Sequence, residues 1–319
     1  METIPHISPN YEPLTYTEDF RLYRSPKYLY ATPDYFMQLP KEISKCVVFI
    51  GAKKQDGGYD YKGTAFWISR NSAIPEKIWT YLVTAKHIVD KIRGLSTGMG
   101  MRVNRHDGTS EWIEIPINNW HFHPTDSTCD IAIMTDISPD FKIYDWYRTT
   151  VDSIVDENYI NKYELQAGDD VFSPGLFARH VGIEKSIPII RVGTIAAMET
   201  DDLQIYGDGR RMKGYLIESR SIGGLSGSPV FTNLTSFRIL NGTYKNVFPN
   251  DCYALLGITW GHWDVPNDLE GKSINAGISI ITPASRIVEV LNQTIIRAQE
   301  EWNELRIRLE TAATLDSKK

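Results

Sequence analysis

Three short motifs in the 319-residue chain carry the side chains that catalysis by a serine hydroxyl requires. Ser226 lies in Gly-Leu-Ser-Gly-Ser-Pro-Val, His87 ends Thr-Ala-Lys-His, and Asp130 opens Asp-Ile-Ala-Ile-Met. A serine hydroxyl is nearly inert at neutral pH, so it needs a base within hydrogen-bond reach and a group that orients this base. The order His, Asp, Ser is one of three chain orders known for such a triad. We therefore predict that His87, Asp130 and Ser226 form a catalytic triad.

Each member of the predicted triad has a role. His87 follows a strand-like run and serves as general base, then as general acid toward the leaving amine. Asp130 begins an apolar run, where a buried carboxylate can accept the histidine Nδ1–H. Gly224 and Gly227 permit a tight loop around Ser226 whose N–H groups converge on one point. Gly224 N–H and Ser226 N–H are the predicted oxyanion-hole donors, each typically worth about 2.7–4 kcal/mol.

Each of these residues also has an ordinary structural interpretation. An isolated histidine is more often a buried structural residue, an aspartate before a strand is often an exposed turn residue, and glycine-rich turns are common in β proteins. The three motifs in one fixed order favour the catalytic interpretation.

The composition is that of an ordinary globular protein, with 42% hydrophobic and 23% charged residues. A formal net charge of −6 argues against nonspecific binding to nucleic acid or to anionic membranes. No apolar run is long enough to span a bilayer, and the N-terminus lacks the features of a secretory signal. Cys46, Cys129 and Cys252 are widely spaced, which favours free buried thiols over disulfides. We expect a soluble, cytoplasmic protein.

Short runs of strand-forming residues separated by turns predict a mainly β chain. The runs 45–50, 63–68 and 79–83 are rich in β-branched or aromatic residues, and clusters of Gly, Asp and Asn separate such runs. This pattern predicts two antiparallel β-barrels side by side. The expected divisions are an N-terminal extension (1–42), a first barrel (43–140), an interbarrel linker (141–166), a second barrel (167–282), and a C-terminal α-helix with a tail (283–319).

One convincing helix is predicted to begin at Thr282 and Pro283, a capping residue followed by a proline in the first turn. Apolar residues then recur every three or four positions. They are Ile287, Leu291, Ile295, Ala298, Trp302, Leu305 and Leu309. This stripe either packs back on the barrels or serves oligomerisation or a partner. The tyrosine-rich residues 1–40 either wrap over the domain or bind a partner.

The chain resembles the trypsin/chymotrypsin superfamily of serine proteases, and it looks nearest to the disulfide-free bacterial and HtrA-type branch. The resemblance covers residues 43–291 and rests on the three triad motifs together with the runs 63–66 and 257–261. It implies that each barrel has six strands and that the catalytic cleft lies between the barrels.

The same resemblance implies further site residues. Thr259 would support the catalytic aspartate, and Trp260 with Gly261 would form the strand that pairs with the substrate backbone. Gly277 would line the far wall of the specificity pocket.

Departures from the family pattern limit what the resemblance implies. Leu225 stands where zymogen-activated members carry an aspartate, so activation by trypsin-style cleavage is not expected. The segment after Leu291 is too short for the peptide-binding domain of HtrA proteins, so their quality-control role is not implied. Arg220 lies where many members place the base of the S1 pocket, and a guanidinium there favours Asp or Glu at P1. The alternative is a loop of different length with Arg220 solvated.

No metal or cofactor is expected. His121 and His123 share a strand face, but no cysteine or carboxylate pair at a fitting spacing completes a metal site. We predict a serine endopeptidase that cleaves protein or peptide substrates through an acyl-enzyme intermediate. A regulatory protein that binds the termini is a possible partner, while nucleic acid and membranes are not expected partners. The alternatives are a catalytically silent trypsin-like fold that binds proteins, and an assembly component that uses the C-terminal helix.

Overall fold

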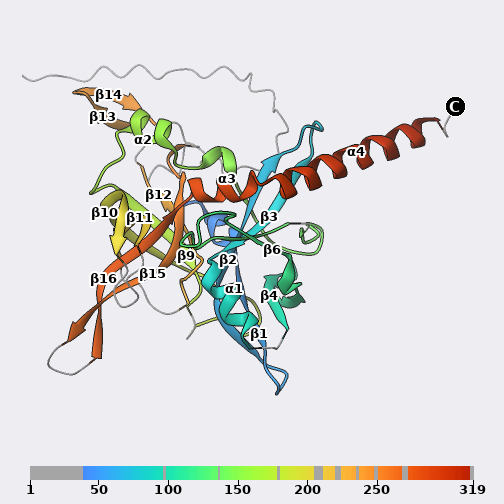
Figure 1. Cartoon of the computed structure of the whole chain (residues 1–319), viewed down its shortest axis with the longest axis horizontal. Helices are drawn as coiled ribbons and strands as arrows, with labels where there is room; N and C mark the ends of the chain where they lie inside the picture. The colour runs from blue at the N-terminus through green and yellow to red at the C-terminus, as the bar shows by residue number, and fades with distance from the viewer. Residues whose placement is uncertain are drawn as a thin grey trace, which may run out of the picture.

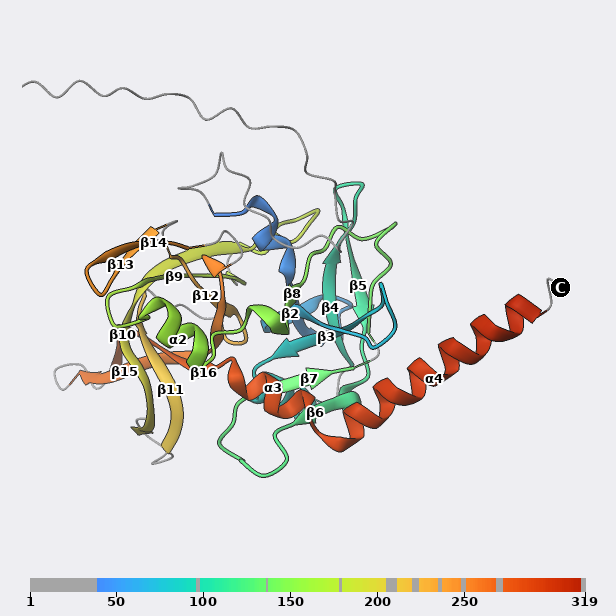
Figure 2. The ribbon, with the colours of Figure 1, turned by 90° about the horizontal axis from the view of Figure 1, so that it is seen from above.

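The computed structural model describes residues 39–95, 98–135, 137–177, 180–204, 211–219, 224–234, 237–247, 251–267 and 272–316. It is mainly β, with two β units packed side by side and helices at the C-terminal end (Figure 1, Figure 2). The predicted class, mainly β with a C-terminal helix, is confirmed. Most of the expected N-terminal extension, residues 1–38, lies outside the described residues.

The first β unit is an eight-stranded sheet with the strand order β5-β4-β1-β2-β3-β7-β6 and with β8 parallel to β2. The 3-10 helix η2 (Lys41–Cys46) precedes it. Its strands are β1 (Val47–Lys53), β2 (Tyr59–Asn71), β3 (Ile78–Thr84), β4 (Met99–Asn104), β5 (Ser110–Glu114), β6 (Trp120–Phe122), β7 (Ala132–Met134) and β8 (Thr149–Thr150). Helix α1 (Lys86–Arg93) follows β3 and packs Ile88, Val89 and Ile92 into the core of this unit.

This sheet differs from the expected six-stranded barrel. Its two edge strands, β5 and β6, are joined by residues 115–119, yet no ladder connects them within the described residues. Pro116 has no N–H to donate, and the 3-10 turn η3 (Ile117–Asn119) follows it directly. The chain therefore passes between the two edges through a turn, and the hydrogen-bonded sheet stays open there.

The second unit is a closed barrel of six strands in the order β10-β11-β16-β15-β12-β9. The strands are β9 (Asp170–Gly175), β10 (Ile189–Gln204), β11 (Arg211–Glu218), β12 (Pro229–Thr232), β15 (Leu255–Asn267) and β16 (Lys272–Pro283). A hairpin of β13 (Phe237–Leu240) and β14 (Thr243–Asn246) forms a separate two-stranded sheet. The 3-10 helix η4 (Val151–Ser153) and helix α2 (Glu157–Tyr163) lie in the predicted linker between the units.

An apolar core joins the two units. Phe66 of the first sheet shares one buried cluster with Phe172 and Phe231 of the barrel, whose ring centroids lie 5.3 Å apart. Ile287 and Leu291, from helix α3 (Ser285–Leu291), belong to the same cluster. Full burial of one such side chain typically contributes about 1.5–3 kcal/mol. Packing therefore sets the relative position of the two units.

The predicted C-terminal helix is two helices. Strand β16 continues to Pro283, α3 begins at Ser285, and α4 (Thr294–Asp316) follows a break at residues 292–293. Tertiary contacts account for the break, because the Asn292 side chain accepts a hydrogen bond from Arg70 and the Gln293 side chain donates to the Phe122 carbonyl. The far half of α4 extends away from both β units (Figure 2).

Three further features bear on the sequence predictions. Cys46, Cys129 and Cys252 are buried and free, as predicted. Burial raises the pKa of the Cys129 thiol to about 12 and that of Cys252 to about 11, so both stay protonated at neutral pH. In the part of the chain that the structure describes, no helix has the length and apolar character needed to cross a membrane.

The core between the units predicts a contrast between two isoleucines. Ile287 is fully buried in the joint cluster, whereas Ile183 is 98% exposed. We expect Ile287→Ala to lower the free energy of unfolding by about 2–5 kcal/mol because it leaves a cavity. Ile183→Ala should change it by less than about 0.5 kcal/mol. Urea unfolding of both variants measures the difference, and equal effects would contradict the packing described here.

Candidate active site

His87 and Asp130 form a directly bonded pair at the edge of the first unit. His87 is the second residue of α1, and Asp130 lies in the loop just before β7. The His87 Nδ1 and the Asp130 Oδ2 are 2.6 Å apart, and the His87 backbone N–H donates to Oδ1 at 2.8 Å. The Asp130 side chain is 8% exposed and the His87 side chain 40% exposed. The histidine thus opens a helix rather than ending a strand, while the aspartate is buried as predicted.

The Asp130 carboxylate also caps the N-terminus of helix α1. The residue at the N-cap position, Ala85, offers no side-chain acceptor, so the first N–H groups of the helix need acceptors from elsewhere. Asp130 accepts from His87 through its carboxylate and from the Lys86 N–H through its carbonyl at 3.3 Å. A negative charge at this end of a helix is also favoured by the helix dipole. One carboxylate thereby holds both the helix and the imidazole.

This contact determines which face of the imidazole is available. A carboxylate can only accept a hydrogen bond, so Nδ1 carries the proton and Nε2 is the acceptor of the neutral ring. The ring centroid of Trp260, from β15, lies 6.1 Å from that of His87. A hollow beside His87 is lined by Asp90 and Asp130 of the first unit and by Met212 and Trp260 of the barrel. The histidine therefore borders a cleft between the two units.

Ser226 lies on a tight turn that leads into β12. Gly224 and Gly227, on either side of it, have φ angles of +103° and +82°, which residues with a Cβ rarely adopt. The Ser228 N–H donates to the Leu225 carbonyl at 2.9 Å, closing the turn. Ser226 itself is half-buried. The glycines predicted to shape this loop are therefore required by its backbone conformation.

Thr64 of β2 connects the serine turn to the first unit. Its N–H donates to the Ser226 carbonyl at 3.0 Å, and its Oγ1 donates to the Gly224 carbonyl at 3.1 Å. The same Oγ1 accepts the Leu176 N–H at 2.8 Å, and the Thr64 carbonyl accepts from Thr84 Oγ1 at 2.7 Å. Every polar atom of this fully buried residue is therefore paired. Thr64 was not singled out from the sequence, because no local pattern distinguishes it from other strand threonines.

Two close approaches at glycines connect the serine turn with the segment around His87. A Cβ added at Gly227 would lie 2.1 Å from the Thr64 carbonyl oxygen and 3.2 Å from the backbone nitrogen of Ala85. A Cβ added at Gly63 would lie 3.0 Å from the Ser226 carbonyl oxygen and 3.1 Å from the Ile88 side chain. The serine turn and the residues that flank His87 therefore pack on the same part of β2, around Gly63 and Thr64. No hydrogen bond joins Ser226 Oγ to His87 among the described residues, and catalytic hydrogen bonds are often long in ligand-free sites.

Two backbone donors of the serine turn have no partner among the described residues. Within the described parts of the chain, the N–H groups of Gly224 and Ser226 donate no hydrogen bond. By contrast, the N–H of Gly227 donates to the Thr259 carbonyl at 2.8 Å. The two unpaired donors are the pair expected from the sequence for an oxyanion hole.

Four of the five predicted substrate-binding residues lie on barrel strands β15 and β16. Thr259, on β15, exchanges backbone hydrogen bonds with Gly227 and Ser228, and none joins it to Asp130 in the described structure. Trp260 lies at an irregularity in the β15–β16 register, next to Gly261, which has open space around it. Gly277 has a φ of +78° and also faces open space. Arg220 lies outside the described residues.

A polar layer at the end of the barrel, near Leu225, was missed from the sequence. Arg191 of β10 pairs in register with Ser173 of β9, and both border a small cavity together with Leu225, Ser219 and Ser279. The Ser219 and Ser279 hydroxyls are 2.9 Å apart. Within the described residues, the Arg191 side chain has no hydrogen bond or ion pair, and its Nε is buried. The sequence signal that could have identified Arg191 is a single charged residue inside an apolar, strand-like run.

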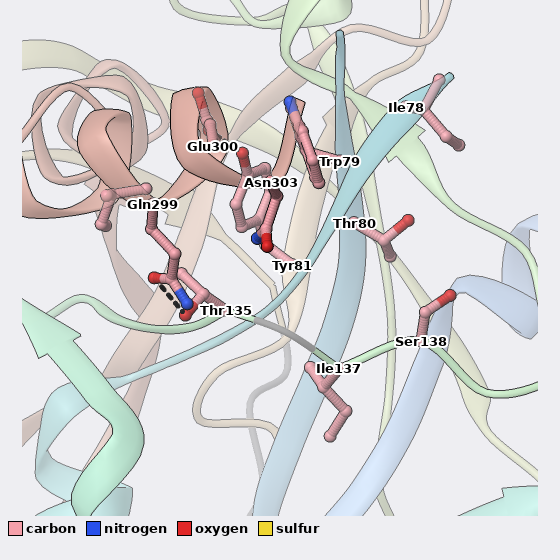
Figure 3. Close-up of a pocket in the computed structure, with 11 residues that line it drawn as sticks. Ile78, Trp79, Thr80, Tyr81, Thr135, Ile137, Ser138, Gln299, Glu300 and Asn303 are labelled. Atoms are coloured by element: carbon pink, nitrogen blue, oxygen red, sulfur yellow. Dashed lines mark hydrogen bonds between the residues drawn. The ribbon is translucent and has the colours of Figure 1, made fainter. Parts of the chain in front are cut away.

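In the described ranges, no group of three or more His, Cys, Asp or Glu side chains is arranged to hold a metal ion. His123, suspected as half of a histidine pair, has its Nε2 2.8 Å from Glu289. Another cavity lies between α4 and β3, bordered by Trp79, Thr135 and Gln299, and it contains no triad residue (Figure 3).

Comparison with known proteins finds similarity only among solved structures. No family profile and no curated protein matches the chain. The MamO protease domain from Magnetospirillum magneticum, in its apo form, is 15% identical with a TM-score of 0.46, over 80% of this chain and 100% of that one. Deg5 is 14% identical with a TM-score of 0.41, over 77% and 87%. Both have trypsin-like serine protease folds, in agreement with the resemblance seen in the sequence. At TM-scores below 0.5 they carry no argument about activity, which depends on the site itself.

The Thr64 contacts predict a measurable effect of removing one hydroxyl. Thr64→Val keeps the shape of the side chain but leaves the Gly224 carbonyl and the Leu176 N–H without a partner. We expect a loss of about 1–3 kcal/mol per buried group left unpaired in the free energy of unfolding. Thr282→Val is the matched control, because the Thr282 hydroxyl is buried and unpaired in the described structure and its removal should be neutral or stabilising. Urea titrations that rank the two variants equally would contradict this account.

Proposed function

We propose that this chain is a serine endopeptidase that uses His87, Asp130 and Ser226. The observation that carries the proposal is the bonded His87–Asp130 pair beside a serine turn that is attached to the same sheet through Thr64. The three side chains come from segments 43 and 96 residues apart along the chain (130 − 87 = 43 and 226 − 130 = 96). The bonded pair and the attachment of the serine turn through Thr64 support the assignment of these three side chains to one site.

The chemistry begins at the serine hydroxyl. His87 Nε2 takes the Ser226 proton as Oγ attacks the carbonyl carbon of the scissile peptide, and the imidazolium then protonates the leaving amine. Asp130 stays ionised, keeps the ring oriented and stabilises the imidazolium. A water molecule, activated by the same imidazole, hydrolyses the acyl-enzyme and restores the hydroxyl.

The oxyanion of each tetrahedral intermediate would be bound by the N–H groups of Gly224 and Ser226. Both donors are unpaired in the described structure, so binding the oxyanion breaks no existing hydrogen bond. Their position is set by the glycine conformations and by Thr64, and donors fixed in advance need no reorganisation during the reaction. Gly224→Ala is disfavoured at this φ angle, which explains why the loop carries glycine there.

Substrate would bind along β15 beside the cleft. Gly261 has open space where a side chain would stand, so an extended peptide backbone can approach it closely. Trp260 borders the cleft next to His87 and offers an apolar surface to residues near the scissile bond. This arrangement supports a polypeptide substrate over a small ester.

Arg191 supports an acidic residue at P1. Arg191 and Leu225, the residue before the nucleophile, line the same small cavity, and within the described residues the Arg191 side chain has no counter-ion. A partly buried cation without a partner is unfavourable, and a carboxylate that pairs with it recovers the lost interactions. The Ser219 and Ser279 hydroxyls can donate further hydrogen bonds to that carboxylate. Arg191 thereby takes the role that the sequence suggested for Arg220.

A reducing compartment such as the cytoplasm suits the three buried free thiols.

The triad is tested with a fluorophosphonate probe and a peptide substrate. We expect the wild-type protein to be labelled at Ser226, and Ser226→Ala and His87→Ala to abolish labelling and reduce kcat by about 10⁴-fold or more. Ser228→Ala is the matched control, because that hydroxyl lies in the same turn but is fully buried and unpaired in the described structure. The control should remain labelled.

An unlabelled wild-type protein that is folded would refute the peptidase. A catalytically silent fold that binds proteins would then be the remaining function of the cleft.

The P1 preference is tested by changing the charge at Arg191. With substrates that differ only at P1, we expect Glu to be preferred to Leu by the wild-type protein. Arg191→Met should reduce kcat/KM for the Glu substrate by about 10- to 150-fold, the value of a charged hydrogen bond, and leave the Leu substrate nearly unchanged. Arg191→Lys keeps the charge and should retain part of the preference. Equal losses on both substrates would mean that Arg191 only stabilises the barrel.

A further inference from the structure

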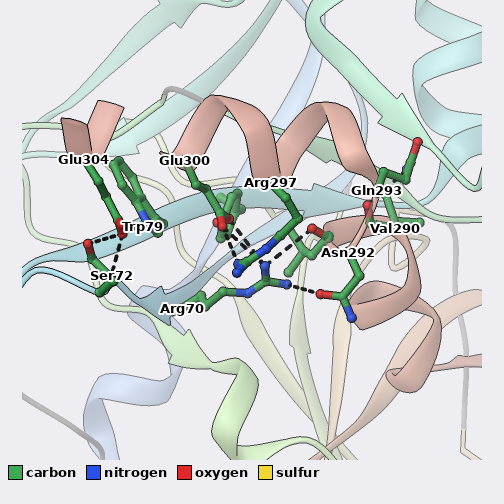
Figure 4. A network of polar contacts seen from close by, with 12 residues as sticks. Arg70, Ser72, Trp79, Val290, Asn292, Gln293, Arg297, Glu300 and Glu304 are labelled. Atoms are coloured by element: carbon green, nitrogen blue, oxygen red, sulfur yellow. Dashed lines mark hydrogen bonds and ion pairs between the residues drawn. The ribbon is translucent and has the colours of Figure 1, made fainter. Parts of the chain in front are cut away.

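Helix α4 has two faces, and the protein body occupies only one. Ile296 is 1% exposed and packs into the core between the units. Glu300, 6% exposed, accepts hydrogen bonds from Tyr81, Arg70 and Arg297 (Figure 4). One turn further, Glu304 accepts from the Ala73 N–H at 2.9 Å and from other groups of the β2–β3 loop and β3 (Figure 4). These contacts hold the first half of α4 firmly on the first unit.

The opposite face carries large apolar side chains that are exposed. Ile295, Trp302, Leu305 and Leu309 are 62%, 67%, 50% and 62% exposed. Such a contiguous exposed apolar surface is unusual on a monomer and typically marks an interface. The second half of the helix extends beyond the β units, where no part of the described chain covers it (Figure 2).

The spacing of this stripe is that of a coiled coil. Large residues at 295, 302 and 309 are seven apart, with Leu305 between them, and Ala298 and Ala312 complete the alternating steps of three and four. A repeat of this kind fills the a and d positions of a heptad, whose seam faces another helix rather than a sheet. The body contacts, at 296, 300 and 304, fall outside the seam. The two faces therefore serve two different neighbours.

We propose that α4 pairs with α4 of a second copy of this chain as an antiparallel two-stranded coiled coil. A twofold axis between positions 302 and 305 places Trp302 opposite Leu305 of the second copy, and Ala298 opposite Leu309. Ile295 then faces Ala312. Each large residue meets one of different size, which is how facing positions of a helix pair fill space.

Shape favours the antiparallel orientation, and the charges are compatible with it. Around the same axis Glu301 lies beside Arg308 of the second copy, and the symmetry repeats this attractive pair. A parallel pair would stack Trp302 on Trp302 and Ala298 on Ala298, a crowded layer beside an empty one. In the antiparallel pair, the projecting half of each helix, residues 305–316, covers the docked half of the other. The two protease bodies then lie at opposite ends of the pair.

Sedimentation velocity of the full chain over a wide concentration series tests the pairing. We expect a reversible dimer for the wild-type protein and a monomer for Trp302→Glu. Because Trp302 is exposed in the single copy, the variant should melt at the same temperature as the wild type at concentrations where the wild type is also monomeric. Glu301→Arg and Arg308→Glu should each weaken dimerisation by about 2- to 5-fold, while the double variant recovers it. A wild-type protein that is monomeric at every concentration would overturn the proposal.

Cysteine cross-linking tests the orientation. The three natural cysteines are buried, so an introduced thiol on α4 reacts selectively. Under mild oxidation, a mixture of the Ala298→Cys and Leu309→Cys proteins should form the mixed disulfide dimer, and neither variant alone should cross-link. Efficient cross-linking of Ala298→Cys with itself would show a parallel pair and overturn the antiparallel arrangement.

Discussion

The serine turn depends on one buried threonine of the other β unit. Thr64 donates to two carbonyls of this turn and accepts from the end of β9, so the turn and β9 share one hydroxyl of the first sheet. The turn also exchanges backbone hydrogen bonds with Thr259 of its own barrel. Its conformation is therefore maintained in part by hydrogen bonds from a strand that lies far away in the sequence, and the apolar core between the units keeps that strand in place.

Asp130 shows a second case of one group with two structural tasks. Helix α1 begins after Ala85, which has no side-chain acceptor, and the carboxylate supplies the missing one. The same carboxylate orients the His87 ring. The group that orients the imidazole is therefore itself fixed by its hydrogen bond to the start of the helix. One residue therefore both caps the helix and orients the base.

The apolar stripe of the C-terminal helices is buried on α3 and exposed on α4. The stripe read from the sequence is continuous, but only its first part, on α3, enters the core, with Ile287 and Leu291. On α4 a different set of positions, including Ile296 and Glu300, contacts the body. The stripe itself remains exposed there. A helix that is bound on one face and apolar on the other provides a rigid platform for a second helix.

The sequence by itself determined the fold class, the three motifs and the free buried cysteines, because these depend on residue type and local spacing. His87, Asp130 and the glycines of the serine turn were recognisable for this reason. Only the tertiary structure decided three other features. They are the open edge of the first sheet, the helix break at Asn292 and the hydrogen bonds from Thr64 to the serine turn. Each arises from hydrogen bonds between residues far apart in the chain, and local patterns carry no record of such partners. Arg191 belongs to the same group, because only closure of the barrel places its charge beside three serines.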